Sequence, residues 1–271
     1  MAIGALPVLV GDAAEPGRRG LREGPGAWRG HAARGVDSRT RLLSCAAGAR
    51  RPHVQPKIPP MPICEADPWR LQFFDGVPCP DDVRVPTEDG DAWAWHPEHR
   101  WVYNKLMVAE SQGFSCGPHG LDPPGFPVFS KPVFNMRGMG TGSRVLQSKR
   151  EYQHFQRPGH IWMPLLSGEH VSTDVAVVRG EARWWRHALG HPLDGGMFDR
   201  WTVLADGRPE VEDYCGRWLK RHLSAYTGMV NFETIGARII EVHLRFADQW
   251  PDLYGGRPWV EALVGLYADG R

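Results

Sequence analysis

The stretch VNFETIGARIIEVHLR, residues 230–245, reads as two β-strands joined by a tight turn. Two runs rich in apolar residues flank Gly236-Ala237, a dipeptide suited to a short hairpin connection. The pattern therefore predicts that residues 230–235 pair as an antiparallel hairpin with residues 238–242.

Polar and charged side chains gather on this hairpin. Because successive side chains of a strand point to opposite faces, Glu241, His243 and Arg245 share one side of the second strand, and Glu233 lies on its partner. A divalent cation bridging to phosphate oxygens would compensate the like charges of the glutamates. In the plainer interpretation, Glu241 and Arg245 form a cross-strand ion-pair network, and His243 is hydrogen-bonded at the rim. These residues alone leave both open.

A lysine and a glycine-rich loop lie upstream. Lys131 closes the strand VFSK, and the loop NMRGMGTGS, residues 135–143, leads into a second strand at residues 144–146. Backbone N–H groups of such a loop can approach phosphate oxygens without a Cβ in the way, and lysine adds a point charge. The residues suited to this role are Gly138, Gly140, Gly142 and Ser143. A flexible surface turn beside a solvated lysine is the alternative.

Helices and strands are mixed along the rest of the chain. Residues 103–112 read as a helix closed by Gly113, and residues 209–226 as a longer helix that ends at Gly228. The other expected elements are a helical turn at 151–155, an apolar run at 161–166, and strands at 171–178 and 182–187. Strict βαβ alternation and an early G-x-G-x-x-G are absent, so the predicted fold class is α+β.

The composition argues against several classes of protein. Of 271 residues, 42% are hydrophobic, and 32 Lys and Arg against 31 Asp and Glu leave a net charge of +1, which predicts no nucleic-acid or membrane partner. Five scattered cysteines without C-x-x-C spacing argue against a disulfide framework or a zinc knuckle. The apolar start, residues 2–10, is too short for a membrane span and lacks a basic flank. We therefore expect a cytoplasmic protein.

Three segments differ in composition. Residues 1–60 are rich in Gly, Ala, Arg and Pro without apolar periodicity, which predicts a disordered extension or an over-long start, with an arginine-rich targeting peptide as the alternative. Residues 61–103 are rich in tryptophan and carry turn signals such as Asp89-Gly90. Residues 104–271 hold the elements described above, in two parts that divide near residue 160.

Other candidate residues have plainer roles. His187 and His191 are spaced i, i+4, but the glycine and proline around His191 do not suit a helix, so structural or solvated histidines are favoured over a metal site. Trp201 is expected in the core or at a domain interface, because no basic track makes it a stacking platform. Asp174 suits a buried hydrogen bond and a catalytic role equally well.

Taken in order, these elements resemble the ATP-grasp superfamily of carboxylate ligases over about half of the chain. That family has one lysine at the start of a helix, here Lys105 in NKLMVAESQG, and another in a P-x-x-x-K-P context, here Lys131 in PVFSKP. The loop GMGTGS follows, then an apolar hinge, here residues 163–166, and a ribose-binding G-x-E, here residues 168–170. The last element, E-x-N-x-R, is matched by EVHLR at residues 241–245.

The resemblance implies two α+β subdomains whose antiparallel sheets grip ATP and Mg²⁺. The residues that it assigns to the phosphates are Lys105, Lys131, Gly138, Gly140, Gly142 and Ser143. Those that it assigns to the base and ribose are Met163, Leu165, Leu166, Glu169 and His170, and those for metal ions are Glu233, Glu241 and His243. Lys131 and Arg245 are the implied catalytic residues, with Arg245 on the transferring phosphoryl group.

The implied reaction is an ATP-dependent ligation. A small-molecule or peptide carboxylate is activated as an acyl phosphate and then captured by an amine. A small-molecule kinase on the same scaffold and a nucleotide-binding module without catalysis are the alternatives.

The sequence departs from the family pattern at the metal and ribose positions. His243 stands where the family has a metal-binding asparagine, and imidazole suits Mn²⁺ better than Mg²⁺. Spacing from Asp174 favours His170 as the ribose residue, whereas residue type favours Glu169.

The front of the chain is a further departure. The family has a complete α/β domain before the first lysine, and here residues 61–103 form a truncated remnant of it. The acceptor site is therefore expected from residues 68–103 with the C-terminal segment, or from a second copy of the chain or a partner subunit, unless the acceptor is itself large, such as a peptide.

Overall fold

The computed structural model describes residues 63–64, 67–134, 136, 140–192, 198–247 and 256–270. All of them belong to one compact unit, Gln55–Arg271. Residues 1–60, for which an extension was predicted, and Gly138 of the glycine-rich loop lie outside the described residues.

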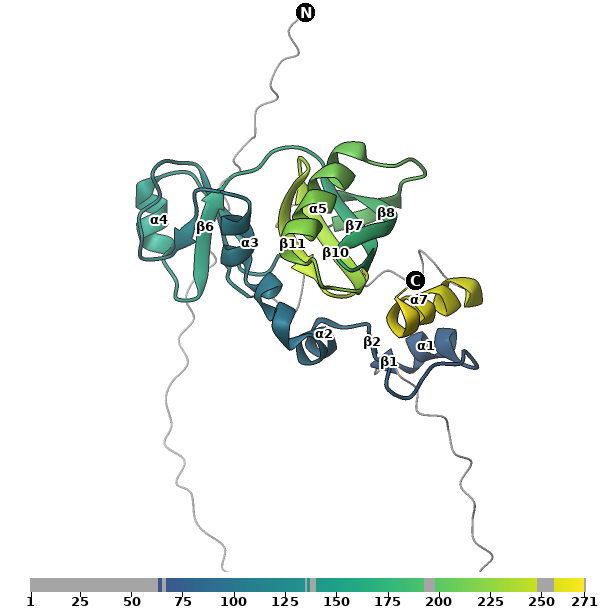
Figure 1. Cartoon of the computed structure of the whole chain (residues 1–271). Helices are drawn as coiled ribbons and strands as arrows, with labels where there is room; N and C mark the ends of the chain where they lie inside the picture. Colours follow the sequence, from purple (N-terminus) through teal and green to yellow (C-terminus); the bar gives the residue numbers. More distant parts are fainter. Residues whose placement is uncertain are drawn as a thin grey trace, which may run out of the picture. The chain divides into compact units, whose positions relative to one another are not determined.

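Two antiparallel sheets form the framework (Figure 1). The small sheet has four strands in the order β3-β6-β4-β5, which are Gly117–Pro118, His160–Pro164, Val128–Pro132 and Arg144–Leu146. The large sheet has five in the order β11-β10-β7-β8-β9, which are Arg238–His243, Gly228–Ile235, His170–Val178, Glu181–Pro192 and Phe198–Val203. Together with the helices they confirm the predicted α+β class.

Two short helices contact the sheets, the first mainly through β11 of the large sheet and also through β6, and the second through β5 of the small sheet. The helix α3 (Lys105–Ser111) begins where the side chain of Asn104 accepts two backbone N–H groups of the first turn, and it ends before Gly113, whose φ is 75°. The helix α4 (Lys149–Phe155) is capped by Ser148. A small core beside the small sheet consists of Val128, Leu146, Tyr152 and Trp162.

The helix α5 (Pro209–His222) covers one face of the large sheet (Figure 1). Its buried residues Val211, Cys215, Trp218 and Leu219 pack against Val175, Val177, Val230, Phe232 and Val242 of the sheet. The prediction that this helix runs to residue 226 is wrong. The backbone turns after His222 so that Tyr226 can accept the N–H of Gly180, and Gly228 opens β10 instead of ending the helix.

The turn of the β10–β11 hairpin is tight. Gly236 and Ala237 have φ angles of 55° and 61°, and two successive positive values are typical of a type I′ turn. The turn also contacts the segment between the two sheets, because a Cβ on Gly236 would lie 2.3 Å from the carbonyl oxygen of Ser167 and one on Gly168 would lie 2.7 Å from Cα of Gly236. Glycine at both positions therefore lets the connecting segment, residues 165–169, lie directly on the hairpin.

We call residues 67–103 the front segment. Its elements are α1 (Pro68–Leu71), η1 (Gln72–Phe74), β2 (Val85–Pro86), α2 (Asp89–Trp95) and η2 (Pro97–Tyr103), and β1 (Ile63–Cys64) pairs in parallel with β2. The predicted turn at Asp89-Gly90 is wrong, since Asp89 begins α2. Burial of Ala92 in the main core favours a helix there over the local turn preference.

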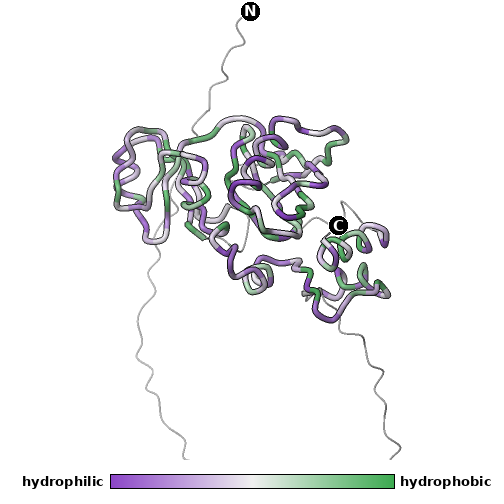
Figure 2. The backbone as a smooth tube through the Cα atoms, viewed as in Figure 1, coloured by the Kyte–Doolittle hydropathy of each residue, from purple (hydrophilic) through white to green (hydrophobic). Residues whose placement is uncertain are grey.

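The front segment shares a second core with the last helix, α7 (Arg257–Asp269). The buried members of this core are Phe74, Val83, Val85, Met229, Phe246, Val260, Leu263 and Leu266. In Figure 2 hydrophobic and hydrophilic stretches alternate along the backbone. Over the described residues, no helix is long and apolar enough to cross a membrane.

Candidate active site

A cavity of about 1150 Å³ is lined by both sheets and by the segment between them. We call its two sides the small-sheet wall and the large-sheet wall. The small-sheet wall includes Phe129, Lys131, Gly140, Ser143, Val145, Met163, Leu165, Leu166, Gly168 and Glu169. The large-sheet wall includes His170, Ser172, Gly190, Phe198, Trp201, Asn231, Glu233, Ile240, Glu241, His243 and Arg245.

Most of the predicted site residues line this cavity. They are Lys131, Gly140, Ser143, Met163, Leu165, Leu166, Glu169, His170, Glu233, Glu241, His243 and Arg245. Gly142 lies beside the cavity, where a Cβ would meet His160 and Pro132. Lys105 reaches the site through its ion pair with Glu241.

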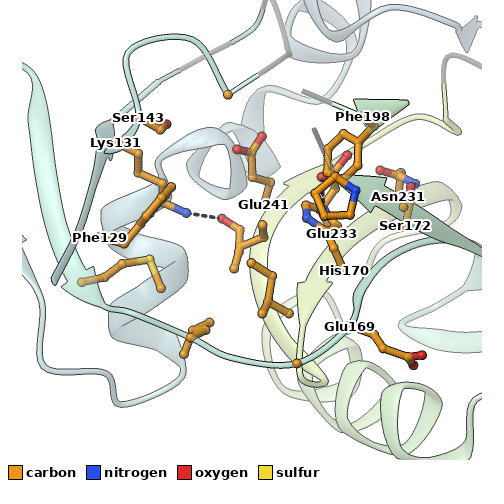
Figure 3. A pocket seen from close by; sticks show the side chains of 18 of the residues that line it. Phe129, Lys131, Ser143, Glu169, His170, Ser172, Phe198, Asn231, Glu233 and Glu241 are labelled. Atoms are coloured by element: carbon orange, nitrogen blue, oxygen red, sulfur yellow. Dashed lines mark hydrogen bonds and ion pairs between the residues drawn. The ribbon is translucent and has the colours of Figure 1, made fainter. Parts of the chain in front are cut away.

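Lys131 is the buried cation of the small-sheet wall. Its Nζ donates a hydrogen bond to the carbonyl oxygen of Ile240 at 2.6 Å, drawn as a dashed line in Figure 3, and so points to the strand that carries Glu241. Burial lowers the pKa of Lys131 to about 7, although the carboxylate of Glu241 acts in the opposite direction. A phosphate group entering the cavity would favour the charged form of this lysine.

Two carboxylates face each other across the hairpin. Glu233 and Glu241 are directly paired in the register of β10 and β11. Each is bonded to a basic group, because Oε2 of Glu233 lies 2.7 Å from Nε2 of His170 and Glu241 accepts the ammonium of Lys105. Burial alone would raise the pKa of Glu241, but the charge of Lys105, the hydrogen bond from His243 and the charge of Lys131 together outweigh it, so the pKa is well below the usual range.

A carboxylate that the sequence did not single out completes the ionic end of the cavity. Asp89 is 4% exposed and accepts hydrogen bonds from Nδ1 of His243 at 3.0 Å and from Nε of Arg245 at 2.9 Å. We call Asp89, Lys105, Glu241, His243 and Arg245 the ionic cluster. It resembles the ion-pair network of the plainer interpretation, but Arg245 pairs with Asp89 rather than Glu241, and His243 is buried rather than at a rim.

His243 lies between two carboxylates of this cluster. Its Nε2 is 3.6 Å from Oε2 of Glu241, while Nδ1 faces Asp89. Burial alone would lower the pKa of His243, but Asp89 and Glu241 outweigh that effect and raise it to about 9. In this arrangement the imidazole acts as a hydrogen-bond donor.

No protein-family model matches the sequence, and no curated protein matches it either. Solved structures match the fold. The crystal structure of L-amino acid ligase from Bacillus licheniformis superposes with a TM-score of 0.52 at 14% identity, over 73% of this chain and 58% of the ligase. The chain has an ATP-grasp fold.

Two further structures show weaker likenesses. N5-carboxyaminoimidazole synthase from Aspergillus clavatus, in complex with ADP and 5-aminoimidazole ribonucleotide, has a TM-score of 0.49 at 11% identity over 69% of this chain and 60% of that one. A putative ATP-grasp superfamily protein from Archaeoglobus fulgidus has a TM-score of 0.44 at 15% identity, over 61% of this chain and 53% of that one. The fold assignment rests on the Bacillus ligase, of whose length this chain spans 58%.

Within this ATP-grasp fold, both candidates for the ribose position line the cavity. The carboxylate of Glu169 lies 3.3 Å from Arg208, and its backbone carbonyl accepts the N–H of Gly236. His170 is bonded to Glu233. The alternative between Glu169 and His170 therefore stays open.

An aromatic group extends the large-sheet wall of the ATP-grasp cavity beyond His170. The ring centre of Phe198 lies 4.7 Å from that of His170 and 4.5 Å from that of Trp201. Gly190 makes room for it, since a Cβ there would lie 2.7 Å from the Phe198 ring. Trp201 was expected in the core or at a domain interface. Only the register of β8 with β9, which places Trp201 opposite Gly190, brings it to the cavity.

Other residues weighed from the sequence have structural roles. His187 lies on β8, as expected outside a helix, and contacts Thr173 and Glu212 at 3.0 Å each. Asp174 accepts hydrogen bonds from the side chain of Asn231 and the backbone N–H of Ala247, which favours the buried hydrogen-bonding role.

The donor set of the cavity fits one hard cation shared with a nucleotide. Magnesium is commonly held by one or two carboxylates plus phosphate oxygens and water, and Glu233 and Glu241 supply such a pair. A site made of protein ligands alone is not present in the described part of the chain, where no group of three or more His, Cys, Asp or Glu side chains could hold a metal ion.

Proposed function

We propose that the protein is an ATP-dependent ligase that joins a carboxylate to an amine. A carboxylate oxygen attacks the γ-phosphorus of ATP and ADP leaves. The amine nitrogen then attacks the carbon of the acyl phosphate, inorganic phosphate leaves, and the nitrogen gives up a proton. The observation that carries this proposal is the convergence of Lys131, Glu233, Glu241 and Arg245 on one cavity.

The small-sheet wall suits the nucleotide. Phe129, Met163 and Leu165 give an apolar surface for the adenine ring beside the connecting segment. Lys131, together with backbone groups near Gly140 and Ser143, then faces the phosphates. Because burial makes the charged form of Lys131 costly, an anionic phosphate is the natural partner for it.

The large-sheet wall suits the chemistry. Glu233 and Glu241 are the residues that would hold Mg²⁺, and when bound the ion supplies positive charge to the phosphate oxygens. Lys105, which does not itself line the cavity, donates a hydrogen bond to the carboxylate of Glu241 and so fixes its position. Arg245 lines the same end of the cavity, where its guanidinium stabilises charge that develops on the transferring phosphoryl group.

The substrates of this ligase are small-molecule or peptide carboxylates and amines. Phe198 and Trp201 add an aromatic surface to the cavity away from the proposed adenine site. This surface suits an apolar side chain on one of the two substrates.

The experiment that tests the proposal is thermal unfolding with and without ATP plus Mg²⁺. A ligand at 100 times its dissociation constant adds about 2.7 kcal/mol of stability. For a chain of this size that corresponds to a rise in Tm of about 5–10 °C. We expect this shift in the wild type and its loss in Lys131→Ala. The matched control is Lys149→Ala, which removes an exposed lysine paired with Asp122 and keeps the shift.

Product analysis then distinguishes the reactions. ADP and phosphate formed together with an amide support the ligase. A phosphorylated acceptor without need of an amine indicates a small-molecule kinase instead. ATP binding without ADP release under any acceptor indicates a nucleotide-binding module, and no stabilisation by ATP in the wild type contradicts a nucleotide site.

A further inference from the structure

Asp89 connects the front segment to the ionic end of the cavity. It is the first residue of α2, it is 4% exposed, and its partners His243 and Arg245 lie 154 and 156 residues later in the chain. Because both partners are far from Asp89 in the sequence, only the tertiary fold brings them into contact with it.

The geometry of this contact is specific. Both oxygens of Asp89 take part in a fork, with Nε of Arg245 at 2.9 Å from Oδ1 and Nη2 at 3.0 Å from Oδ2. Such a bidentate pair fixes the plane of the guanidinium as well as its distance. The same two oxygens lie 3.0 Å and 3.1 Å from Nδ1 of His243, so one carboxylate orients both side chains.

The backbone beside these side chains is also held by the front segment. The hydroxyl of Tyr103, the last residue of η2, accepts the N–H of Leu244 at 3.2 Å. Arg245 donates through Nη1 to the carbonyl oxygen of Phe246 at 2.8 Å. The strand end that carries His243 and Arg245 is therefore fixed through its backbone and its side chains.

We infer that Asp89 is a positioning residue of this site: by holding the side chains of Arg245 and His243, it sets where the guanidinium meets the transferring phosphoryl group. The inference rests on the proposed function and extends it to the front segment. Residues 67–103 are on this view a part of the site, rather than only a remnant of a lost domain.

Two roles for Asp89 make different predictions. If it only balances buried positive charge, a variant that keeps the charge keeps the activity of each folded molecule. If it positions Arg245, the exact place of the carboxylate matters, because a displacement of about 1 Å of a catalytic group costs about 100-fold in rate.

The experiment compares five variants of the full chain with the wild type. Asp89→Asn removes the charge, and Asp89→Glu keeps it but moves it by one methylene. Asp89→Asn/Arg245→Lys and Arg245→Lys test whether the two residues act together. Glu88→Gln is the matched control, since the neighbouring Glu88 pairs with Arg70 instead. The probe is ATP with Mg²⁺, a mixture of L-amino acids, and hydroxylamine to capture acyl phosphate as hydroxamate.

We expect kcat for Asp89→Asn and Asp89→Glu to fall about 100-fold per folded molecule. The KM for ATP changes by less than about 3-fold, since the small-sheet wall is untouched. The double variant is no slower than Arg245→Lys alone, and Glu88→Gln matches the wild type. Should Asp89→Asn not fold, Asp89→Glu decides the question by itself.

The inference is overturned if Asp89→Glu retains wild-type kcat, or if the losses of Asp89→Asn and Arg245→Lys multiply in the double variant. Failure of the proposed function looks different. In that case the wild type itself shows neither stabilisation by ATP nor hydroxamate, and the variants cannot be told apart from it.

Discussion

The two walls of the cavity handle charge in opposite ways. The large-sheet wall contributes Glu241, His243 and Arg245 to the ionic cluster, and every member of the cluster has an oppositely charged partner within it, from Lys105 with Glu241 to Arg245 with Asp89. On the small-sheet wall, the ammonium of Lys131 donates to the backbone carbonyl of Ile240, and the rest of this wall includes apolar residues such as Phe129 and Met163. The large-sheet wall therefore carries charges that are already paired. The small-sheet wall carries Lys131, whose protonation depends on whether an anionic group enters the cavity.

Under the proposed function, this difference separates ATP binding from the chemical step. A preorganised set of charges can stabilise a transition state without rearranging, which suits the large-sheet wall to catalysis. A buried lysine beside an apolar slot gains most from an anionic ligand, which suits the small-sheet wall to the nucleotide. Changes on the large-sheet wall should therefore alter turnover, and changes on the small-sheet wall should alter ATP binding.

The largest expected effect is on the large-sheet wall. Glu241→Gln should lower the rate of ADP release about 100- to 1000-fold, because it removes a carboxylate that we propose holds Mg²⁺. It should also lower the free energy of unfolding by about 3–5 kcal/mol, because the buried Lys105 loses its partner.

A second substitution tests this account. Glu241→Gln/Lys105→Met removes both charges, so urea unfolding should show most of the stability restored while ADP release stays low. An active Glu241→Gln protein would contradict the assignment. Equal stability of the single and double variants would show that the ion pair is not what the fold depends on.

A smaller effect belongs to Lys131 on the small-sheet wall. The pKa of this lysine is lowered from 10.5 to about 7, so between these pH values the unfolded chain holds a proton that the folded chain does not. Stability should therefore rise with pH in this window, by up to about 1.4 kcal/mol per pH unit. Lys131→Met lacks the ammonium group, so its stability should not show this rise with pH.

The measurement is urea unfolding of both proteins at several pH values above neutrality. The difference between wild type and Lys131→Met isolates this lysine, because all other titrating groups are shared. A difference that stays constant with pH would mean that Lys131 is protonated throughout, and the contrast between the walls would then be lost.

The smallest effects concern the contact that joins the walls. Gly236→Ala should destabilise the protein by about 1–3 kcal/mol, since the new methyl group would meet the carbonyl of Ser167. Ala237→Gly is the matched control on the same turn. It relieves a positive φ of 61° but loses a buried methyl group, so its stability should stay within about 1 kcal/mol of the wild type.

Urea unfolding checks both variants, and the shift in Tm with ATP shows whether the walls remain connected. We expect Gly236→Ala to bind ATP more weakly, because residues 165–169 no longer lie against the hairpin. Full ATP stabilisation in this variant would show that the connecting segment can move away from the large sheet without loss.

Local patterns predicted much of this site. The β10–β11 hairpin follows from apolar runs around Gly236-Ala237. Its register does not follow from them, because an irregularity between Glu233 and Thr234 shifts the pairing and places Glu233 opposite Glu241. Lys131 was found because it closes a short strand before a glycine-rich loop, whereas Lys105, the first residue of α3, was assigned through the resemblance to the ATP-grasp superfamily. Residues that act through neighbours in sequence, or through the period of a strand, can be predicted in this way.

Residues brought together by tertiary packing could not be predicted. Asp89 stands in Asp-Gly, which on its own favours a turn, and its role depends on a strand that begins about 150 residues later. Phe198 and Trp201 reach the cavity through the register of an edge strand, which no periodicity specifies. The plainer interpretation paired Glu241 with Arg245 for the same reason, because sequence spacing favours pairs within one hairpin.

The distance between Asp89 and Arg245 also bears on how the protein is made. A ribosome synthesises residue 89 long before residues 241–245, so a growing chain can form the small sheet while the large-sheet wall is still incomplete. Contacts of such long sequence separation form slowly, because loop closure must come first. Until synthesis reaches the last strand, the small-sheet wall lacks the carboxylate of Glu241 and the other charges of the ionic cluster, so the ionic end of the cavity is completed last.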